Sequence, residues 1–215
     1  MSLASEPGVS VPKKRLRAGA RRDTILRAAK ELFSEKGLFG VSVDELARSV
    51  GTSPAVLYQH FPSKAALYEA VLTECACRRE DYVAAILAEP SDFGSVLRRI
   101  TLVYAASVEQ EPDYLRLEMH SVLEGNKASL QFFENRWEPF TSFVEVELRR
   151  LVEERVIAPV PEKAASLLFQ GAVREALYAK CLDPADRYQG MDLATLINQV
   201  LDLFLRAVGY PVSCD

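Results

Sequence analysis

Apolar residues recur three and four positions apart along much of the chain, which is the spacing of one buried helix face. The first such stretch runs from residue 23 to Gly37, where a glycine ends the pattern. Its apolar positions share one side of the predicted helix, so the segment is expected to pack against a core. These positions are Ile25, Ala28, Ala29, Leu32 and Phe33.

Two shorter helices follow, separated by a tight turn. Ser42 and Glu45 have the spacing of a capping box, in which each side chain satisfies a backbone N–H at the start of a helix. Gly51 ends that helix, because glycine readily adopts the left-handed conformation that turns the chain. Ser53 then caps a second helix over Pro54–His60. Two short helices joined in this way are typical of a helix-turn-helix that reads DNA.

The chain after the second short helix completes a small domain. Pro62 and Ser63 interrupt the chain and begin a long helix, which places Lys64 in its first turn. Phe61 is expected to fill the core beneath the second short helix. The sequence therefore predicts a minimal tri-helical DNA-binding domain.

Three sequence runs occur together in residues 23–72, namely ILRAAKELFSEKG, VSVDELARSVG and LYQHFPSKAAL. In this order and at this spacing they resemble the amino-terminal domain of TetR-family transcriptional regulators. The resemblance covers about a quarter of the chain. It implies an all-helical protein that binds a palindromic operator in double-stranded DNA as a homodimer. It also implies that a small-molecule effector releases the operator by entering the C-terminal domain.

The resemblance assigns phosphate contacts to four residues. Tyr58, His60 and Lys64 match the aromatic, histidine and lysine with which the family contacts the DNA backbone. Ser42, at the start of a helix with its exposed backbone amides, resembles a further phosphate contact. Such contacts position the duplex and do not read its sequence. For Tyr58 and His60, the alternative is a place in the hydrophobic core.

Base contacts are expected from Thr52, Ser53, Ala55 and Gln59, which point toward the major groove in the predicted arrangement. Glutamine can pair bidentately with adenine, and the methyl groups of alanine and threonine suit the thymine methyl. The sequence leaves open which of them reads a base, and solvated surface is the alternative for Thr52 and Gln59. Many relatives carry lysine and glycine in place of Pro54 and Ala55, so base contacts transfer less well than phosphate contacts.

Charge is distributed unevenly along the chain. Residues 1–72 carry 11 Lys and Arg against 7 Asp and Glu, whereas the other 143 residues carry 15 against 23. The formal charge of −4 therefore combines +4 and −8, a basic end that attracts phosphate and an acidic remainder. Residues 1–20, rich in proline and small residues, are expected to form a disordered basic arm. That arm either follows the DNA or is only a solubilising tail.

Helices are also expected throughout the rest of the chain, so the fold class is all-α with about nine helices. The 215 residues, 49% of them apolar, are enough for a buried core. We expect an arm (1–20), a helix-turn-helix DNA-binding domain (21–67) and a helical effector-binding and dimerisation domain (68–215). The expected helices from Ser63 onward cover 63–88, 92–109, 112–123, 127–156, 161–181 and 192–208.

The last two predicted helices each carry a long apolar stripe. Two such helices per subunit suit a four-helix seam between the two copies of a homodimer. Alternatively, the stripes belong to the core of one subunit, because periodicity does not separate a core from an interface. The expected interface residues are Phe169, Val173, Leu177, Leu196, Val200 and Phe204.

Aromatic and adaptable side chains gather in the middle helices. Ligand cavities are mostly apolar with few polar anchors, so this region is expected to bind an apolar or aromatic effector. Core packing is the alternative for each residue, and His120 or Arg116 is a candidate anchor for a carboxylate or hydroxyl. The expected ligand-binding residues are Tyr104, Met119, His120, Phe133, Trp137 and Phe140.

No metal site, cofactor or membrane contact is expected. The four cysteines, Cys75, Cys77, Cys181 and Cys214, are not accompanied by the histidines of a metal site. The chain shows neither a signal peptide's apolar core nor an apolar run of membrane-spanning length, which predicts a cytoplasmic protein with reduced thiols.

Two other functional classes compete with a ligand-responsive repressor. An enzyme is disfavoured, because His60 and His120 are the sole histidines and no catalytic motif is present. The second competitor is a helical adaptor that contacts proteins and does not bind specific DNA. Tyr58 and Lys64, together with His60, favour DNA binding over the adaptor. The operator, the effector and the choice between repression and activation stay open.

Overall fold

The computed structural model describes residues 13–77, 92–183, 185 and 188–211. Within these residues the chain forms nine helices and no strand, which confirms the predicted all-α class. The chain divides into two compact units, Met1–Val71 and Leu72–Asp215. The division falls inside one continuous helix, α4 (Lys64–Cys77), so both units contribute residues to it.

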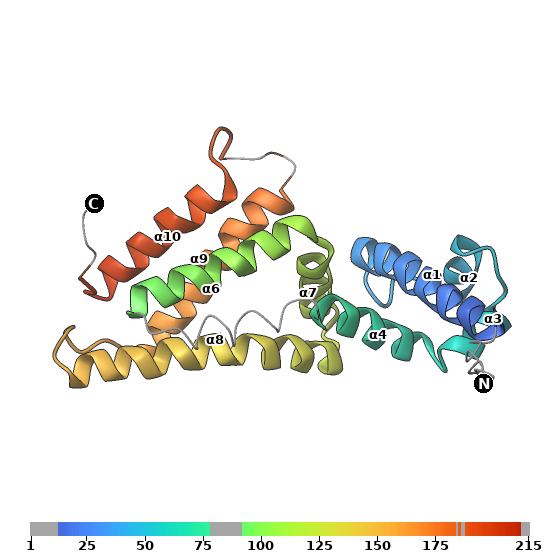
Figure 1. Cartoon of the computed structure of the whole chain (residues 1–215), viewed down its shortest axis with the longest axis horizontal. Helices are drawn as coiled ribbons and strands as arrows, with labels where there is room; N and C mark the ends of the chain where they lie inside the picture. The colour runs from blue at the N-terminus through green and yellow to red at the C-terminus, as the bar shows by residue number, and fades with distance from the viewer. Residues whose placement is uncertain (1–12, 78–91, 184, 186–187, 212–215) are drawn as a thin grey trace, which may run out of the picture. The chain divides into compact units, whose positions relative to one another are not determined.

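The first unit consists of α1 (Lys13–Lys36), α2 (Val43–Ser49), α3 (Pro54–His60) and the beginning of α4 (Figure 1). α1 packs on α2, and α2 packs on α3. The rings of Phe33 and Tyr68 meet edge to face with their centroids 5.0 Å apart. Phe61 is buried, as predicted. These large side chains give the small unit a core of its own.

The start of α1 differs from the prediction. Residues 13–20 were assigned to the disordered arm, but the helix begins at Lys13. Lysine, arginine, leucine and alanine have high helix propensity, and they extend a helix that is already nucleated further along. Residues 1–12 of the predicted arm lie outside the described residues. The buried face of α1 also includes Leu26, which the predicted stripe omitted.

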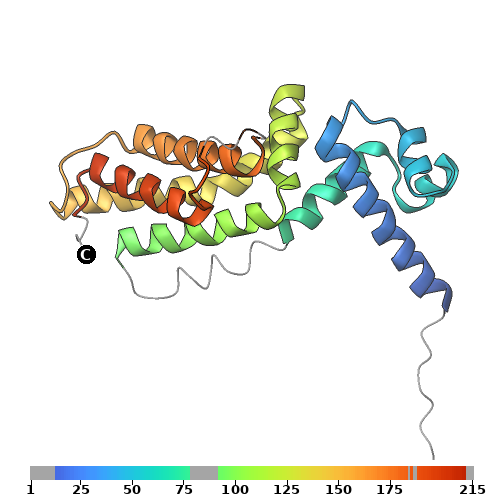
Figure 2. The same cartoon turned by 90° about the horizontal axis from the view of Figure 1, so that it is seen from above.

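The second unit contains five further helices, and their bounds agree with the predicted ones to within a few residues. α9 packs on α6, α8 and α10, α10 also packs on α6, and α7 crosses the ends of α6 and α8 (Figures 1 and 2). Residues 78–91 lie outside the described residues, so the helix predicted over 63–88 is confirmed from Lys64 to Cys77 only. The five are α6 (Phe93–Gln110), α7 (Asp113–Glu124), α8 (Lys127–Glu153), α9 (Glu162–Cys181) and α10 (Leu193–Ala207).

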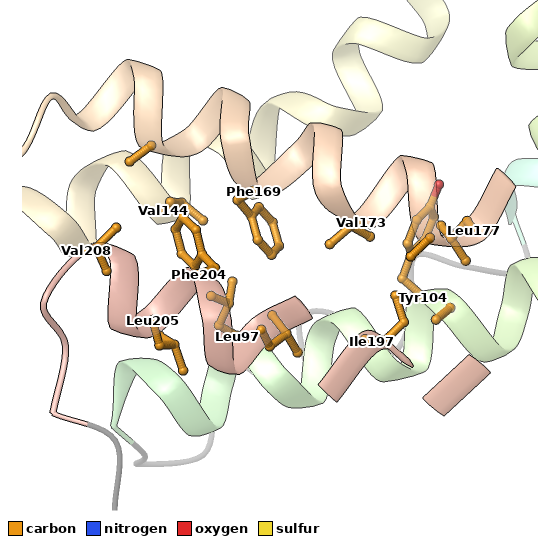
Figure 3. Packing of buried hydrophobic residues seen from close by; sticks show 14 of the residues in the cluster. Leu97, Tyr104, Val144, Phe169, Val173, Leu177, Ile197, Phe204, Leu205 and Val208 are labelled. Atoms are coloured by element: carbon orange, nitrogen blue, oxygen red, sulfur yellow. The ribbon is translucent and has the colours of Figure 1, made fainter. Parts of the chain in front are cut away.

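Side chains from four of these helices fill one hydrophobic core (Figure 3). Phe169 of α9 and Phe204 of α10 lie with their ring centroids 5.4 Å apart. Leu97, Val144 and Ile197, from α6, α8 and α10, have no exposed surface. Because α6, α8, α9 and α10 each supply several of its members, this core holds the second unit together.

Two polar bridges link the beginning of α6 to the C-terminal part of the chain. The Arg98 guanidinium donates hydrogen bonds of 2.6 Å to Asn198 Oδ1 and of 2.6 Å to Asp202 Oδ1, which joins α6 to α10. Asp92 caps α6 by accepting from the Ser95 N–H at 3.0 Å, and it also accepts from the Tyr210 hydroxyl at 3.0 Å. None of the helices described is both long enough and apolar enough to cross a membrane.

Candidate functional site

The turn between α2 and α3 is built as the sequence predicts. The Ser42 hydroxyl accepts a hydrogen bond of 3.1 Å from the Glu45 N–H at the start of α2. Gly51 has a φ of +63°, the left-handed conformation that a side chain disfavours. The Ser53 hydroxyl accepts from the Val56 N–H at 3.5 Å, and Pro54 is the first residue of α3. These caps define where α3 begins.

An ion pair joins the end of α1 to α2. The Lys36 ammonium donates to the Glu45 carboxylate. This hydrogen bond lowers the pKa of Glu45, and the Ser42 backbone N–H adds to that effect. The same bond raises the pKa of Lys36. Both groups are therefore charged at neutral pH, and the bridge lies in solvent, where it contributes little to stability.

α3 presents one polar face to solvent. Leu57 is buried beneath it, whereas Tyr58 is 46% exposed. The alternative that Tyr58 belongs to the core is therefore wrong. The predicted DNA-contacting residues that are exposed are Ser42, Ser53, Ala55, Tyr58 and Gln59, and those that are half-buried are Thr52, His60 and Lys64.

Lys64 makes contacts that the sequence did not predict. Its ammonium donates hydrogen bonds of 2.8 Å to the carbonyls of both Leu38 and Val41, in the connector between α1 and α2. An ammonium has three protons, so one remains for another acceptor. Lys64 therefore fixes the connector to the first turn of α4, whether or not it also contacts phosphate.

Phe39 in the same connector is a surface feature that sequence reasoning missed. Its side chain is 67% exposed, and the neighbouring Gly40 approaches the end of α1 so closely that an added Cβ would lie 2.1 Å from the Lys36 carbonyl oxygen. No local pattern distinguishes Phe39 from the adjacent Leu38, which is buried. The exposed ring lies on the unit that carries the helix-turn-helix.

The predicted ligand-binding residues divide into three groups. Tyr104, Trp137 and Phe140 form one aromatic cluster with centroid separations of 5.2, 6.1 and 5.9 Å. Phe133 packs instead on Tyr114 at 5.2 Å. The third group consists of Met119, which is exposed, and His120, which is half-buried. Neither residue lines a cavity of the second unit that the structure describes.

A cleft of about 380 Å³ opens beside the aromatic cluster. Buried Glu118 accepts a hydrogen bond of 3.0 Å from the Trp137 indole N–H and one of 2.6 Å from the Arg174 guanidinium. A second cavity of about 20 Å³, between Tyr104 and Phe140, is too small for an organic ligand. The cleft is lined by Glu118, Val122, Leu130, Phe133, Glu134, Trp137, Glu138, Thr141, Gln170 and Arg174.

Sequence reasoning missed the ion pair of this cleft, which joins Glu118 to Arg174. Glu118 lies four residues after Tyr114, and both are on the buried face of α7. A glutamate at a buried helical position is a recognisable signal, because an unpaired carboxylate is costly to bury. Arg174 carries no such signal, since its pairing partner is 56 residues away in the sequence.

The predicted dimer stripe packs inside its own subunit. Phe169, Val173, Leu177, Leu196 and Phe204 are at most 8% exposed, and Val200 is partly buried against the same core. A side chain that is already buried has almost no surface left to bury against a second copy. This corrects the assignment of the stripe to an interface. Periodicity identified a buried face without identifying what covers it.

Other apolar side chains of α9 and α10 are exposed to solvent. Leu167 is 69% exposed, Leu168 57% and Leu203 69%. Leu168 and Leu203 are sequence neighbours of Phe169 and Phe204, whose rings are in contact, so the exposed leucines lie at one level of the helix pair. Exposed leucines on two packed helices are candidates for a surface that contacts another protein.

The described residues contain no group of three or more His, Cys, Asp or Glu side chains that could hold a metal ion. Cys75 is buried, and Cys181 is half-buried. Burial raises the pKa of the Cys181 thiol, so at neutral pH the thiol is protonated and a poor nucleophile.

Comparisons with known proteins agree with the helix-turn-helix. The model of the family described as "Bacterial regulatory proteins, tetR family" matches residues 25–71. The chain is 30% identical over 136 residues to the nucleoid occlusion factor SlmA of Edwardsiella ictaluri, a match that spans 63% of this chain and 67% of that protein. It is 29% identical over 163 residues to the Vibrio vulnificus (strain YJ016) protein of the same name, spanning 73% and 82%.

Solved structures extend the likeness to both units. The TetR-family regulator PfmR of Thermus thermophilus aligns with a TM-score of 0.64 at 25% identity, over 85% of this chain and 97% of that one. A TetR-like regulator from a Rhodococcus species aligns with a TM-score of 0.68 at 18% identity, over 93% and 99%, and shows the shared fold. The chain therefore belongs to the TetR family of bacterial regulatory proteins and is a DNA-binding transcriptional regulator.

Proposed function

We propose that the protein is a ligand-responsive repressor that binds a palindromic operator as a homodimer and is released by a small effector. The observation that carries the proposal is the face of α3, where capping at Ser53 leaves Ala55, Tyr58 and Gln59 exposed together. A helix that follows a tight turn and presents such a face fits the major groove of DNA.

In the proposed complex the phosphate contacts come from the rim of this face. Tyr58 and His60 reach the backbone from the end of α3, and Ser42 does so from the start of α2. Lys64 uses its third proton, since the other two are donated to the connector. Thr52, Ser53, Ala55 and Gln59 face the bases, and Gln59 has the chemistry to pair with adenine.

The test begins with selection of bound fragments from random DNA, followed by footprinting of the selected sequence. We expect a palindromic footprint, and a Tyr58→Ala variant that binds all fragments more weakly because a backbone contact is lost. Tyr188→Ala is the matched control, since Tyr188 is similarly exposed at 39% but lies in the second unit. Sequence-independent binding by the parent protein, or equal losses in both variants, would contradict the proposal.

The homodimer is proposed to form through the outward faces of α9 and α10, at Leu167, Leu168 and Leu203. We expect a Leu168→Asp/Leu203→Asp double variant to sediment as a monomer and to lose operator affinity, because two half-sites are then bound independently. Leu123→Asp is the control, since Leu123 is 82% exposed on α7. A double variant that stays dimeric would place the interface elsewhere.

Effector control is proposed to act through α4, which belongs to both units. The cleft in the second unit has the volume of a small-molecule site, and its walls combine apolar and aromatic side chains with charged and polar ones. An effector shifts the protein between two states only by its different affinity for them, so it must bind the DNA-releasing state more tightly. Effector titration of the operator complex measures that difference.

A second candidate is a role in nucleoid occlusion. It is favoured by the relatives of that name, whose similarity extends over 163 residues and so well beyond the helix-turn-helix. The candidate predicts that overproduction blocks septa over the nucleoid in a manner that Tyr58→Ala abolishes. Normal division on overproduction, together with operator release by an effector, would favour the repressor.

A further inference from the structure

The cleft beside Trp137 carries an excess of negative charge. Three glutamates, Glu118, Glu134 and Glu138, line it, and Arg174 is the one basic residue among the lining side chains that the structure describes. Glu134 and Glu138 lie four residues apart on α8, one turn along the same helix. With all four ionised, the lining has a formal charge of −2, which disfavours an anionic ligand and favours a cationic one.

The innermost of these carboxylates already binds a cation. Glu118 is 4% exposed, and the Arg174 guanidinium lies 2.6 Å from its Oε1 atom. The same guanidinium carbon lies 5.5 Å from the centre of the Trp137 ring. A carboxylate and an aromatic face around one position are the two groups that attract an organic cation most strongly.

Arg174 reaches this position from the surface of the protein. Its side chain is 42% exposed, whereas that of Glu118 is 5% exposed. The acidic and aromatic groups are therefore fixed inside, and the cation that joins them reaches in from the surface. A ligand with a positive charge can take the place of the guanidinium without leaving Glu118 unpaired, which removes the main cost of opening the pair.

The two other glutamates, Glu134 and Glu138, attract a positively charged ligand to the cleft. Both are exposed residues at the cleft, and neither forms an ion pair with a side chain among the described residues. An anion would meet three carboxylates, and the arginine that would attract it is already neutralised by Glu118. The apolar walls, Phe133, Leu130 and Val122, suit a flat hydrocarbon body attached to the charge.

We propose that the effector is a cationic aromatic molecule, whose charged group replaces the Arg174 guanidinium between Glu118 and Trp137. The inference rests on the proposed function in naming this cleft as the effector site. The sequence predicts an apolar or aromatic effector, and the cleft adds that this effector carries an ammonium, amidinium or similar group.

Trp137 makes the binding step measurable without DNA, because it is the single tryptophan of the chain. We would titrate the full chain with trimethyl(2-naphthylmethyl)ammonium, with its neutral analogue in which a quaternary carbon replaces the nitrogen, and with 2-naphthylacetate. The readouts are Trp137 fluorescence and calorimetry. The cation should bind at least about tenfold more tightly than the neutral analogue, and its affinity should fall as salt is added. The anion should bind most weakly.

Variants separate this site from non-specific attraction to an acidic protein. Glu134→Gln/Glu138→Gln should weaken the cation several-fold while leaving the neutral analogue unchanged. Arg174→Met should strengthen the cation, because the competing guanidinium is gone. Glu153→Gln, near the end of α8 and outside the cleft, is the control for the loss of a negative charge. Equal affinity for the cation and the neutral analogue, tighter binding of the anion, or weaker cation binding in Arg174→Met would overturn the proposal.

Cation binding and operator release are measured separately, so the cationic effector and the repressor function can fail independently. If the cation does not bind but a neutral or anionic compound releases the operator, the repressor stands and the cationic effector does not. If the cation quenches Trp137 with the expected variant pattern but leaves the operator complex intact, the cation site stands and its role as effector site is rejected.

Discussion

The Lys64 ammonium donates a hydrogen bond of 2.8 Å to the backbone carbonyl of Val41, 23 residues earlier in the chain. A second bond of the same length reaches Leu38. A lysine at the beginning of α4 thus holds the connector that leads into α2. One side chain fixes the entrance to the helix-turn-helix, and the same residue is a proposed phosphate contact.

Replacing Lys64 by Met should therefore affect folding as well as DNA binding. Two half-buried carbonyls lose a charged donor, which should cost about 1–3 kcal/mol of local stability. In the absence of DNA, the α2 amides of Lys64→Met should exchange hydrogen faster than those of the parent. The control Lys163→Met, which changes an exposed lysine of α9, should leave the exchange of the α2 amides unchanged. Unchanged α2 protection in Lys64→Met would limit the residue to a DNA contact.

Replacing Gly51 by alanine should lower the free energy of unfolding, whereas replacing Gly19 by alanine should raise it. Both have open space where a Cβ would be added, so only the backbone conformation distinguishes them. Gly51→Ala places a side chain at a φ of +63° and should cost about 1–2 kcal/mol. Gly19→Ala lies within α1 and should add about 0.5–1 kcal/mol. Thermal unfolding of the two variants beside the parent tests the pair, and a shift of the same sign in both would refute it.

Acid should weaken the second unit through the caps of α6 and α10. A hydrogen bond from the Ser95 hydroxyl lowers the pKa of Asp92 below its ordinary value of 3.8, and the Thr195 backbone N–H does the same for Asp192. A lowered folded pKa means that each carboxylate stabilises the fold above the ordinary value, and that this contribution is lost as pH falls through the folded value.

The variant Asp92→Asn/Asp192→Asn should accordingly lose stability less steeply than the parent below about pH 4, because asparagine also caps a helix but does not titrate. Tyr210→Phe removes one donor to Asp92 and should give a smaller change. Chemical unfolding at a series of pH values measures the slopes. If the free energy of unfolding falls as steeply with decreasing pH in the double variant as in the parent, other carboxylates cause the loss of stability in acid.

Arg98 should matter more to stability than another exposed arginine. Its two bonds of 2.6 Å join α6 to α10, whereas Arg149 lies 3.6 Å from Glu162 at the surface. Arg98→Met should cost about 1–2 kcal/mol, with its partial exposure taken into account. Arg149→Met should cost less than about 0.5 kcal/mol. Urea unfolding compares them, and equal effects would mean that the α6–α10 bridge is not a stabilising contact.

Much of the first unit could be predicted from sequence because its signals are local. Ser42, Gly51 and Ser53 act within four residues of their own positions, through caps and a left-handed turn. The contacts of Lys64 span more than twenty residues, and no short pattern contains them. The start of α1 is not predicted correctly because the prolines near the beginning of the chain disfavour a helix, whereas the residues after Lys13 favour one.

The second unit shows a different limit of sequence reasoning. The stripes through Phe169 and Phe204 predict buried helix faces, but a period of 3.6 residues shows only that a face is covered. Whether its cover is another helix of the same chain or a second copy depends on how five helices pack. The pair formed by Glu118 and Arg174 likewise depends on that packing, so the charge of the cleft became visible only in three dimensions.

Leu168 and Phe169 are adjacent in the chain, but the first is 57% exposed and the second 2%. Selection therefore acts on them separately: changes at Phe169 are limited by folding, and changes at Leu168 by what the surface meets. In the proposed homodimer, a duplicated copy that altered its outward leucines would stop exchanging subunits with the other copy while its fold is preserved. Two regulators of common origin can in this way become independent circuits within one cell.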